Sequence, residues 1–259
     1  RDIFVRLETL ERNQLNVLQE KYGSEIKSEI NNKEFKIYSQ NGEDGILLYI
    51  FSVLGNKSKK LVEIGIEEGK ECNSANLILN FGWGGLLIEG NNESAMQAKK
   101  YFKSINGVSE NRLKVINIFV TKENINNVLL SHGITGEIGL LSIDIDGNDY
   151  WIFEEIDVIN PMVIVIEYNA SIPVDKSLTV KYDPKFDRFV KHKSGWYHGA
   201  SLQALTKLAY KKGYILVGCE SRGCNAFYVR KDLLRGILKE ISPEKAFYHQ
   251  ISRSKQNSL

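Results

Sequence analysis

The chain has 259 residues, of which 42% are hydrophobic and 25% are charged, and its formal net charge is +2. These values are ordinary for a globular protein of one large or two small α/β domains, and so small a net charge argues against a nucleic-acid-binding protein. The 3 cysteines lack CxxC spacing, which argues against a disulfide framework and a zinc site and favours a cytoplasmic location. No apolar run approaches the roughly 18 residues of a membrane span.

Residues 1–35 are expected to form an N-terminal helical extension. Apolar residues recur at helical spacing from Ile3 to Leu18, which predicts an amphipathic helix over residues 2–22. This helix would pack on the main domain or form the contact of a homodimer. Residues 36–240 are expected to form the main domain, and residues 241–259 a C-terminal tail. The sequence begins at Arg1 rather than Met, which leaves open a targeting segment before it.

The main domain alternates apolar strands with helices. Short apolar runs predict strands over Lys60–Ile64, Gly85–Glu89, Leu113–Val120, Ile138–Asp144 and Met162–Glu167. Periodic segments predict helices over Ser39–Leu54, Asn73–Leu79, Glu93–Phe102, Asn124–Ser131, Tyr150–Ile156 and Ser201–Lys212. Such alternation is typical of an α/β, Rossmann-like, doubly wound sheet with helices on both faces.

The last two expected strands, Tyr214–Cys219 and Asn225–Val229, are separated by only a few residues. A parallel pair needs a crossover of a dozen or more residues, so these strands are expected to form an antiparallel hairpin that closes the mostly parallel sheet. Residues 171–197 are polar and show no clear period. A segment this long without regular structure is unusual in a compact domain, and we expect it to be a lid over the substrate.

The segment Leu61–Glu71 (LVEIGIEEGKE) predicts a ligand-binding turn. A buried strand carries Glu63 at its carboxyl end and passes through Gly65 and Gly69, which permit a tight turn and a close approach of a ligand to the backbone. The next strand ends on Glu89. An acidic residue at this position can accept hydrogen bonds from both hydroxyls of a ribose, so the pair of strands indicates a nucleoside cofactor.

The turn also indicates which cofactor. It contains Glu67 and Glu68, whose carboxylates would repel the pyrophosphate of a dinucleotide. A cofactor with a cationic sulfonium and an ammonium group meets no such repulsion. The turn therefore favours S-adenosylmethionine over NAD, and a nicotinamide-dependent oxidoreductase is the alternative.

Acidic and amide side chains follow the two central strands. Asp144 and Asp146 end one, and Glu167 and Asn169 end the other. Because parallel neighbours end at the same edge of a sheet, these groups are expected to converge, and unpaired they would repel each other. Mg²⁺ or another divalent cation held by Asp146, Glu167 and Asn169 would resolve this. In the metal-free alternative, His198 serves as a general base.

Several motifs resemble one family. The layout of a parallel sheet closed by a hairpin is similar to that of class I S-adenosylmethionine-dependent methyltransferases, and the motifs resemble an FkbM-like branch of them. The matching segments are SQNGEDGIL (Ser39–Leu47), LVEIGIEEGKECNSANL (Leu61–Leu77), WGGLLIEGN (Trp83–Asn91), LLSIDIDGNDYWI (Leu140–Ile152), VIVIEYNA (Val163–Ala170) and the segment Gly199–Arg230. The chain departs from the family's general pattern at Glu67, which replaces the middle glycine of the turn.

The resemblance implies O-methylation of a sugar, phospho-sugar or related small metabolite in the biosynthesis of surface polysaccharide (capsule) or natural products. It implies that the cofactor is bound by Gln40, Asp44, Glu63, Gly65, Gly69, Asn73, Glu89, Asn91 and Asp144. The residues implied in catalysis are Asp144, Asp146, Glu167 and His198, and those implied in acceptor binding are Tyr168, Asn169 and Asn225. A divalent cation would bind the acceptor hydroxyl, lower its pKa and orient it toward the methyl group.

The expected lid is basic, with Lys181, Lys185, Arg188, Lys191 and Lys193. These residues either form a solvated surface or attract an anionic acceptor. A subunit that keeps the fold without catalysis is a further alternative.

Overall fold

The computed structural model describes residues 30–55, 57–105, 108–234 and 236–250. The expected helix over residues 2–22, and with it the homodimer contact, lies outside the described residues. Within the described ranges, no helix is both long and apolar enough to cross a membrane.

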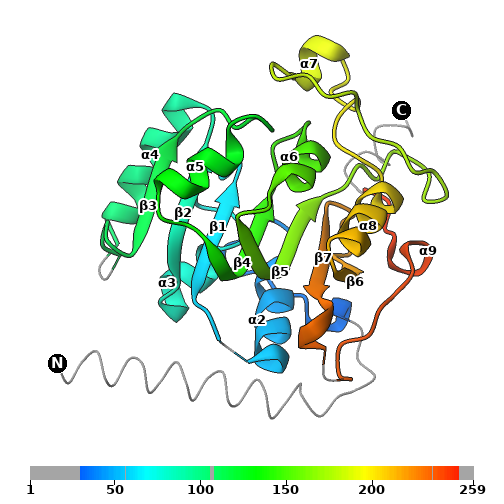
Figure 1. The fold of residues 1–259 in the computed structure, drawn as a ribbon, viewed down its shortest axis with the longest axis horizontal. Coiled ribbons are helices and arrows are strands. Elements are labelled where there is room, and N and C mark those ends of the chain that lie inside the picture. Colours follow the sequence, from blue (N-terminus) through cyan, green and yellow to red (C-terminus); the bar gives the residue numbers. More distant parts are fainter. Residues whose placement is uncertain (1–29, 56, 106–107, 235, 251–259) are drawn as a thin grey trace.

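A sheet of 7 strands in the order β3-β2-β1-β4-β5-β7-β6 forms the centre of the molecule (Figure 1). The strands are β1 (Lys60–Ile64), β2 (Gly84–Glu89), β3 (Leu113–Asn117), β4 (Gly136–Ile143), β5 (Ile159–Glu167), β6 (Tyr214–Cys219) and β7 (Asn225–Arg230). Strands β1 to β5 are parallel to their neighbours, and β7 runs antiparallel to both β5 and β6. The predicted α/β fold with a closing hairpin is confirmed.

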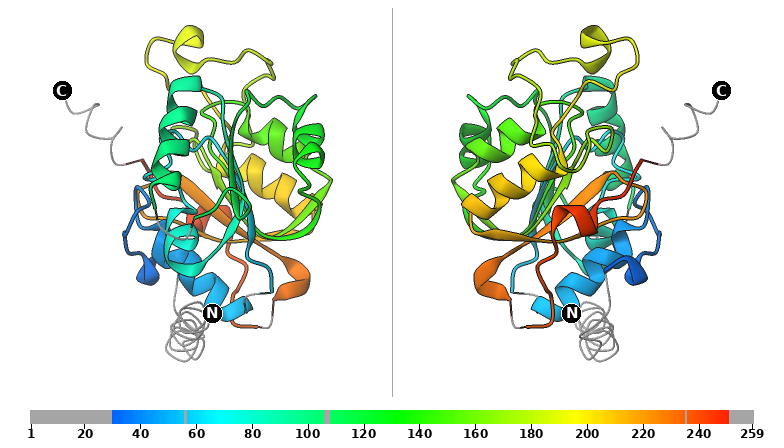
Figure 2. Two further views of the ribbon diagram at one scale, coloured as in Figure 1. Left: turned by 90° about the vertical axis from the view of Figure 1, so that its left-hand side faces the viewer. Right: turned by 90° about the vertical axis from the view of Figure 1, so that its right-hand side faces the viewer.

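Helices cover both faces of the sheet (Figure 2). On one face lie α2 (Glu43–Leu54), α3 (Ala75–Phe81) and α4 (Asn92–Lys103), and on the other lie α5 (Ile125–Ser131), α6 (Asp149–Glu155) and α8 (Leu202–Lys211). Side chains alternate between the faces: in β1, Leu61 packs with the first group of helices, and Val62 and Ile64 pack with the second. Burial of these apolar side chains against both helix layers is the main stabilising term.

Three shorter helical segments lie at the ends of the fold: η1 (Ile30–Lys33), η2 (Lys231–Leu233) and α9 (Pro243–Ala246). Residue Asn31 of η1 connects to β6, because its amide Nδ2 donates to the carbonyl of Cys219 at 2.7 Å.

Some predicted boundaries are wrong by a few residues. β3 ends at Asn117 rather than Val120. At this end, the side-chain amide of Asn117 donates hydrogen bonds to the carbonyls of Glu89 (2.9 Å) and Gly90 (3.0 Å). β5 begins at Ile159 rather than Met162, because Ile159 and Asn160 already pair with Gly136 and Glu137 of β4.

The fold places a ligand site at one edge of the sheet. The order of strands reverses between β1 and β4, since the chain first builds outward from β1 through β2 to β3 and then returns to the other side of β1. In open α/β sheets, ligands bind at this point, outside the carboxyl ends of the strands. The segment 171–197 extends from the same edge and carries α7 (Arg188–Lys191) at the far end of the molecule (Figure 1).

Candidate active site

An open cleft of about 1090 Å³ lies at the carboxyl ends of the parallel strands. The turn after β1, the ends of β2, β4 and β5, and part of the segment 171–197 form its walls. Many of the predicted site residues line it, namely Gln40, Glu63, Gly65, Gly69, Asn73, Glu89, Asn91, Asp144, Asp146, Glu167 and Asn225. The structure therefore brings together residues from most of the chain.

The turn after β1 passes very close to the end of β4. Gly65 has φ +82°, and a Cβ atom at this position would lie 1.6 Å from the carbonyl oxygen of Asp144. Gly69 also has a positive φ, and its Cβ would meet the ring of Phe102 at 2.6 Å. Both positions therefore require glycine, as the sequence pattern indicates.

Glu63 fixes the segment that leads into α3. Its carboxylate accepts hydrogen bonds from the backbone N–H groups of Asn73 (2.8 Å) and Ser74 (2.9 Å) and from the hydroxyl of Ser142 (3.2 Å). Burial raises the pKa of Glu63, and these hydrogen bonds oppose the rise. The Asn73 amide donates to Ser142 at 3.1 Å, so β1, β4 and the turn are joined at one point.

Glu89 is held in place by two backbone N–H groups. One carboxylate oxygen accepts from Glu67 at 2.8 Å and the other from Asn91 at 2.7 Å. Each oxygen keeps a further lone pair, which leaves the carboxylate able to accept two ribose hydroxyls. The side chain of Asn91 caps α4 by accepting from the backbone of Glu93 and Ser94.

The cleft is strongly acidic. Among the described residues that line it, only Lys70 and Arg188 are basic, and Lys70 pairs with Glu68 at 2.8 Å. Burial, and then the nearby charges of Asp146 and Glu89, raise the pKa of Glu67. The acidic lining residues are Glu43, Glu63, Glu67, Glu68, Glu71, Glu89, Asp144, Asp146, Glu167 and Asp187.

The loop after β4 carries two carboxylates of the cleft. β4 ends at Ile143, so Asp144 and Asp146 lie beyond the strand, and Asp146 has φ +56°. Asp149 organises this loop by accepting hydrogen bonds from the backbone of Ile145 (2.8 Å) and Gly147 (2.9 Å). Sequence reasoning missed Asp149, although its place at the start of a helix is a signal for such a role.

Asp144 lies in electrostatically unfavourable surroundings. Burial, followed by the charges of Glu167, Asp146 and Asp149, raises its pKa well above the usual range. Among the described residues, no side-chain or backbone hydrogen bond reaches its carboxylate. The negative charges around Asp144 would therefore stabilise a cation or a positively charged ligand bound there.

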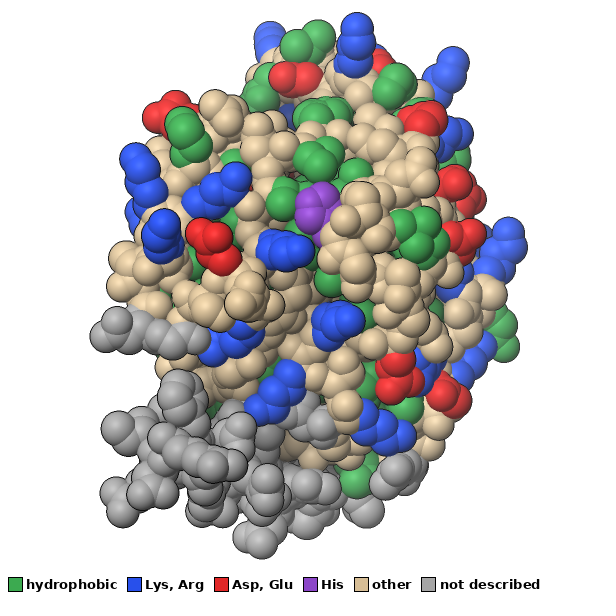
Figure 3. Space-filling view, turned by 60° about the vertical axis from the view of Figure 1, so that its left-hand side comes forward, with side chains coloured by type: hydrophobic (Ala, Val, Ile, Leu, Met, Phe, Trp, Pro, Cys, Tyr) green, Lys and Arg blue, Asp and Glu red, His purple; other side chains and the backbone are tan. Residues whose placement is uncertain are grey.

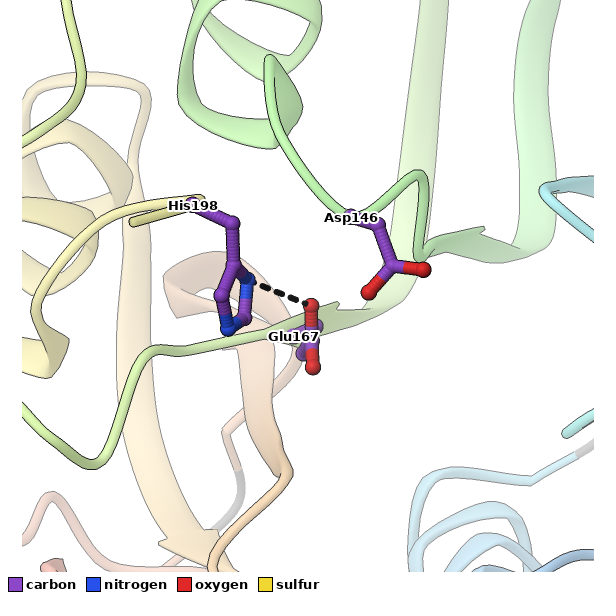
Figure 4. A group of neighbouring side chains, drawn as sticks. All are labelled: Asp146, Glu167 and His198. Atoms are coloured by element: carbon purple, nitrogen blue, oxygen red, sulfur yellow. Dashed lines mark ion pairs between the residues drawn. The ribbon is translucent and has the colours of Figure 1, made fainter. Parts of the chain in front are cut away.

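Glu167 at the end of β5 meets Asp146 and His198 (Figure 4). The Nδ1 atom of His198 lies 3.4 Å from a carboxylate oxygen of Glu167, and His198 is only 1% exposed. One potential metal-binding atom from each of the three residues lies within 4.8 Å of the others, and the same holds for the set Asp144, Asp149 and Glu167. Glu167 lines the cleft, whereas His198 lies behind it.

Asn169 bonds to the backbone on both sides of residues 171–197. Its amide Nδ2 donates to the backbone carbonyls of Trp196 and His198, both at 2.9 Å, and its Oδ1 accepts from the N–H of Ser171. Asn169 thus holds the end of the lid segment and the backbone of His198. A role for Asn169 in binding a cation stays a prediction, and the structure adds His198 as a possible ligand beside Asp146 and Glu167.

Two further predicted residues lie outside the lining of the cleft. The carboxylate of Asp44 accepts hydrogen bonds from the backbone of Ile37, Tyr38 and Ser39 and so folds the segment before α2. The Tyr168 hydroxyl bonds to the backbone of Tyr248, on the C-terminal segment. Roles for these two side chains in binding ligands stay predictions.

Asn225 and Glu43 form one wall of the cleft. The Asn225 amide donates to the Glu43 carboxylate at 2.9 Å, and both residues are buried. The sequence indicated Asn225 but not Glu43.

No family model and no curated protein sequence matches the chain. Among solved structures, the N-terminal domain of EvdMO1 with S-adenosylhomocysteine bound is 12% identical over 82% of this chain and 94% of that chain, with a TM-score of 0.47. The O-methyltransferase from Bacillus cereus in complex with S-adenosylhomocysteine is 14% identical over 82% and 89%, with a TM-score of 0.46. A protein from Klebsiella pneumoniae assigned as an O-methyltransferase is 14% identical over 84% and 89%, also at 0.46. Identities this low transfer neither an activity nor site residues to this chain.

Proposed function

We propose that this protein is an S-adenosylmethionine-dependent methyltransferase that acts on an oxygen of a sugar, phospho-sugar or related small metabolite, in the biosynthesis of surface polysaccharide or natural products. The observation that carries the proposal is the acidic cleft at the point where the strand order reverses, with Glu89 held at the end of β2 beside the Gly65–Gly69 turn. The resemblance of the motifs to the FkbM-like branch supplies the acceptor class.

The residues of the cleft suit a cationic cofactor. Glu89 would hold the ribose hydroxyls, and the acidic turn around Glu67 favours the sulfonium and ammonium groups over a pyrophosphate. A nicotinamide dinucleotide would bring two phosphate charges toward this turn, which makes the oxidoreductase alternative less favourable. When bound, S-adenosylmethionine supplies an electrophilic methyl group.

Glu167 and His198 would handle the proton of the acceptor hydroxyl. Glu167 presents its carboxylate to the cleft, and the buried His198 supports it from behind at 3.4 Å. Glu167 accepts the proton in this arrangement, and His198 stabilises and orients the carboxylate. His198 is therefore a positioning residue rather than a base that meets the acceptor directly.

Asp146, Glu167 and His198 also form a donor set that fits a divalent cation. Carboxylate oxygens suit Mg²⁺, and an imidazole together with carboxylates suits Mn²⁺ as well. Their ligand atoms lie within 4.8 Å of each other. Acidic side chains also outnumber basic ones among the described residues that line the cleft. A cation held there would polarise the acceptor hydroxyl and offset the repulsion around Asp144.

The acceptor would meet more negative than positive charge. Of the basic residues of the lid, Arg188 is the one that lines the described cleft, whereas Lys181, Lys185, Lys191 and Lys193 do not. A neutral sugar hydroxyl therefore suits the lining, and a phospho-sugar would depend on Arg188 and on a cation.

Calorimetry with S-adenosylhomocysteine, with NAD as a control ligand, tests the cofactor assignment. We expect binding of the homocysteine product alone, and at about 100 times its Kd a rise of roughly 2.7 kcal/mol in the free energy of unfolding. Glu89→Gln should weaken binding by about 10- to 100-fold, since a hydrogen bond to a charged group contributes roughly 1.5–3 kcal/mol. Glu93→Gln, an exposed glutamate outside the cleft, is the matched control.

Binding of NAD alone would overturn the proposal in favour of the oxidoreductase, and equal affinities of the Glu89 and Glu93 variants would remove Glu89 from the site. Binding of S-adenosylhomocysteine without methyl transfer to any sugar or phospho-sugar tested would favour the non-catalytic alternative.

A further inference from the structure

Arg188 joins the lid to the catalytic loop. Its guanidinium forms a partly buried ion pair with the carboxylate of Asp146, across 42 positions of the sequence. Asp187 caps α7 by accepting from the backbone of Phe189 (2.8 Å) and Val190 (3.0 Å), and the guanidinium lies over the Phe189 ring at 5.0 Å. The start of α7 therefore directs Arg188 into the cleft.

Asp146 belongs at the same time to the donor set with Glu167 and His198 (Figure 4). A divalent cation held by this set would need the Asp146 carboxylate that Arg188 now neutralises. The guanidinium and the cation would then be two like charges on one carboxylate, and they would repel each other. The two partners of Asp146 therefore compete.

The lid is the partner that can move. Asp149 anchors the Asp146 loop through two backbone hydrogen bonds, and β4 precedes it. By contrast, α7 has no buried residue, and Phe189 and Val190 are 63% and 81% exposed. Figure 3 shows hydrophobic side chains at the surface, among basic and acidic ones, at the upper end of the molecule, where Figure 1 places α7. Release of Arg188 would thus expose little buried surface.

We propose that Arg188 is an exchangeable partner of Asp146: it neutralises Asp146 and fastens the lid while the cation site is empty, and a divalent cation displaces it. The displaced guanidinium becomes the available positive group of the cleft for an anionic acceptor, because the other basic lining residue of the described cleft, Lys70, pairs with Glu68. The inference rests on the cation site of the proposed function.

Titration of the full chain with Mn²⁺, followed by electron paramagnetic resonance of the free ion, tests the exchange. A half-exposed ion pair contributes about 0.5–1 kcal/mol, so Arg188→Gln should bind Mn²⁺ about two- to fivefold more tightly than the wild type. Lys193→Gln removes the same charge from the same lid without touching Asp146, and its affinity should stay within about twofold of the wild type. Trypsin should cut the lid faster when Mn²⁺ is added to the wild type, and equally fast with or without Mn²⁺ in Arg188→Gln.

Equal Mn²⁺ affinities of the two variants, weaker binding by Arg188→Gln, or no binding by the wild type would each overturn the exchange. Calorimetry with S-adenosylhomocysteine on the same samples separates the failures: retained binding of the homocysteine product would leave the proposed methyltransferase intact and refute the exchange alone.

Discussion

Removal of the charge of Asp144 should stabilise the protein. The Asp144 carboxylate accepts no hydrogen bond from the described residues, and its oxygen lies within 4.8 Å of an oxygen of Glu167. Two unit charges at that distance repel by about 0.9 kcal/mol at the dielectric constant of water and by about 3.5 kcal/mol at an effective value of 20. Asp144→Asn should therefore raise the free energy of unfolding within this interval, or the Tm by about 2–7 °C.

The stabilisation should depend on pH in a defined direction. Because the pKa of Asp144 is raised in the folded protein, the native wild type binds a proton that the unfolded chain has already lost. The wild type therefore loses stability as the pH rises from the ordinary range of an aspartate, near 4, toward the raised pKa. The advantage of Asp144→Asn should be small at pH 5 and should grow toward pH 8.

Differential scanning calorimetry at several pH values measures both effects, and Asp149→Asn is the matched control. Burial raises the pKa of Asp149 as well, but its carboxylate accepts from Ile145 and Gly147, so this variant should lose about 1–3 kcal/mol. A cation at the cluster should stabilise the wild type more than Asp144→Asn. An Asp144→Asn variant that melts below the wild type, or an advantage equal at pH 5 and pH 8, would refute the reasoning.

Two other substitutions probe the turn and the residue that positions the proton acceptor. Gly65→Ala should lower the Tm by several degrees or prevent folding and should abolish binding of S-adenosylhomocysteine in calorimetry, because the new Cβ would lie 1.6 Å from the Asp144 carbonyl; near-normal binding would contradict the close approach. His198→Gln should lower kcat by about 10²-fold and shift the pH profile of kcat/KM, with unchanged affinity for S-adenosylhomocysteine; an unaltered profile would remove His198 from proton handling.

The sequence predicted those parts of the fold and site that depend on local pattern. Apolar runs of strand length, the Gly65 turn and the acidic end of β2 are each set by a few neighbouring residues. The convergence of Asp144, Asp146 and Glu167 in one cleft also followed, because parallel strands must end at one edge.

The sequence pattern failed where the chain leaves regular structure. The alternation of side chains is reliable only within a strand, and β5 ends at Glu167, so the strand pattern does not fix where the side chain of Asn169 lies. The pairing of Arg188 with Asp146 depends on how a lid folds back across the sheet edge. No spacing in the sequence encodes that contact.

The acidic cleft and the basic lid together determine the electrostatics of the site. The described lining gathers acidic side chains around the loop after β4, while most of the lid's basic side chains stay outside it. Such a cleft would be poorly stable if every carboxylate were ionised without a counter-charge, since the repulsion is not offset by hydrogen bonds at Asp144. Two kinds of positive group would relieve it: the cationic cofactor near Glu67, and either Arg188 or a divalent cation at Asp146. Each positive ligand relieves part of the repulsion among the carboxylates, and this relief contributes to the affinity of the cleft for that ligand.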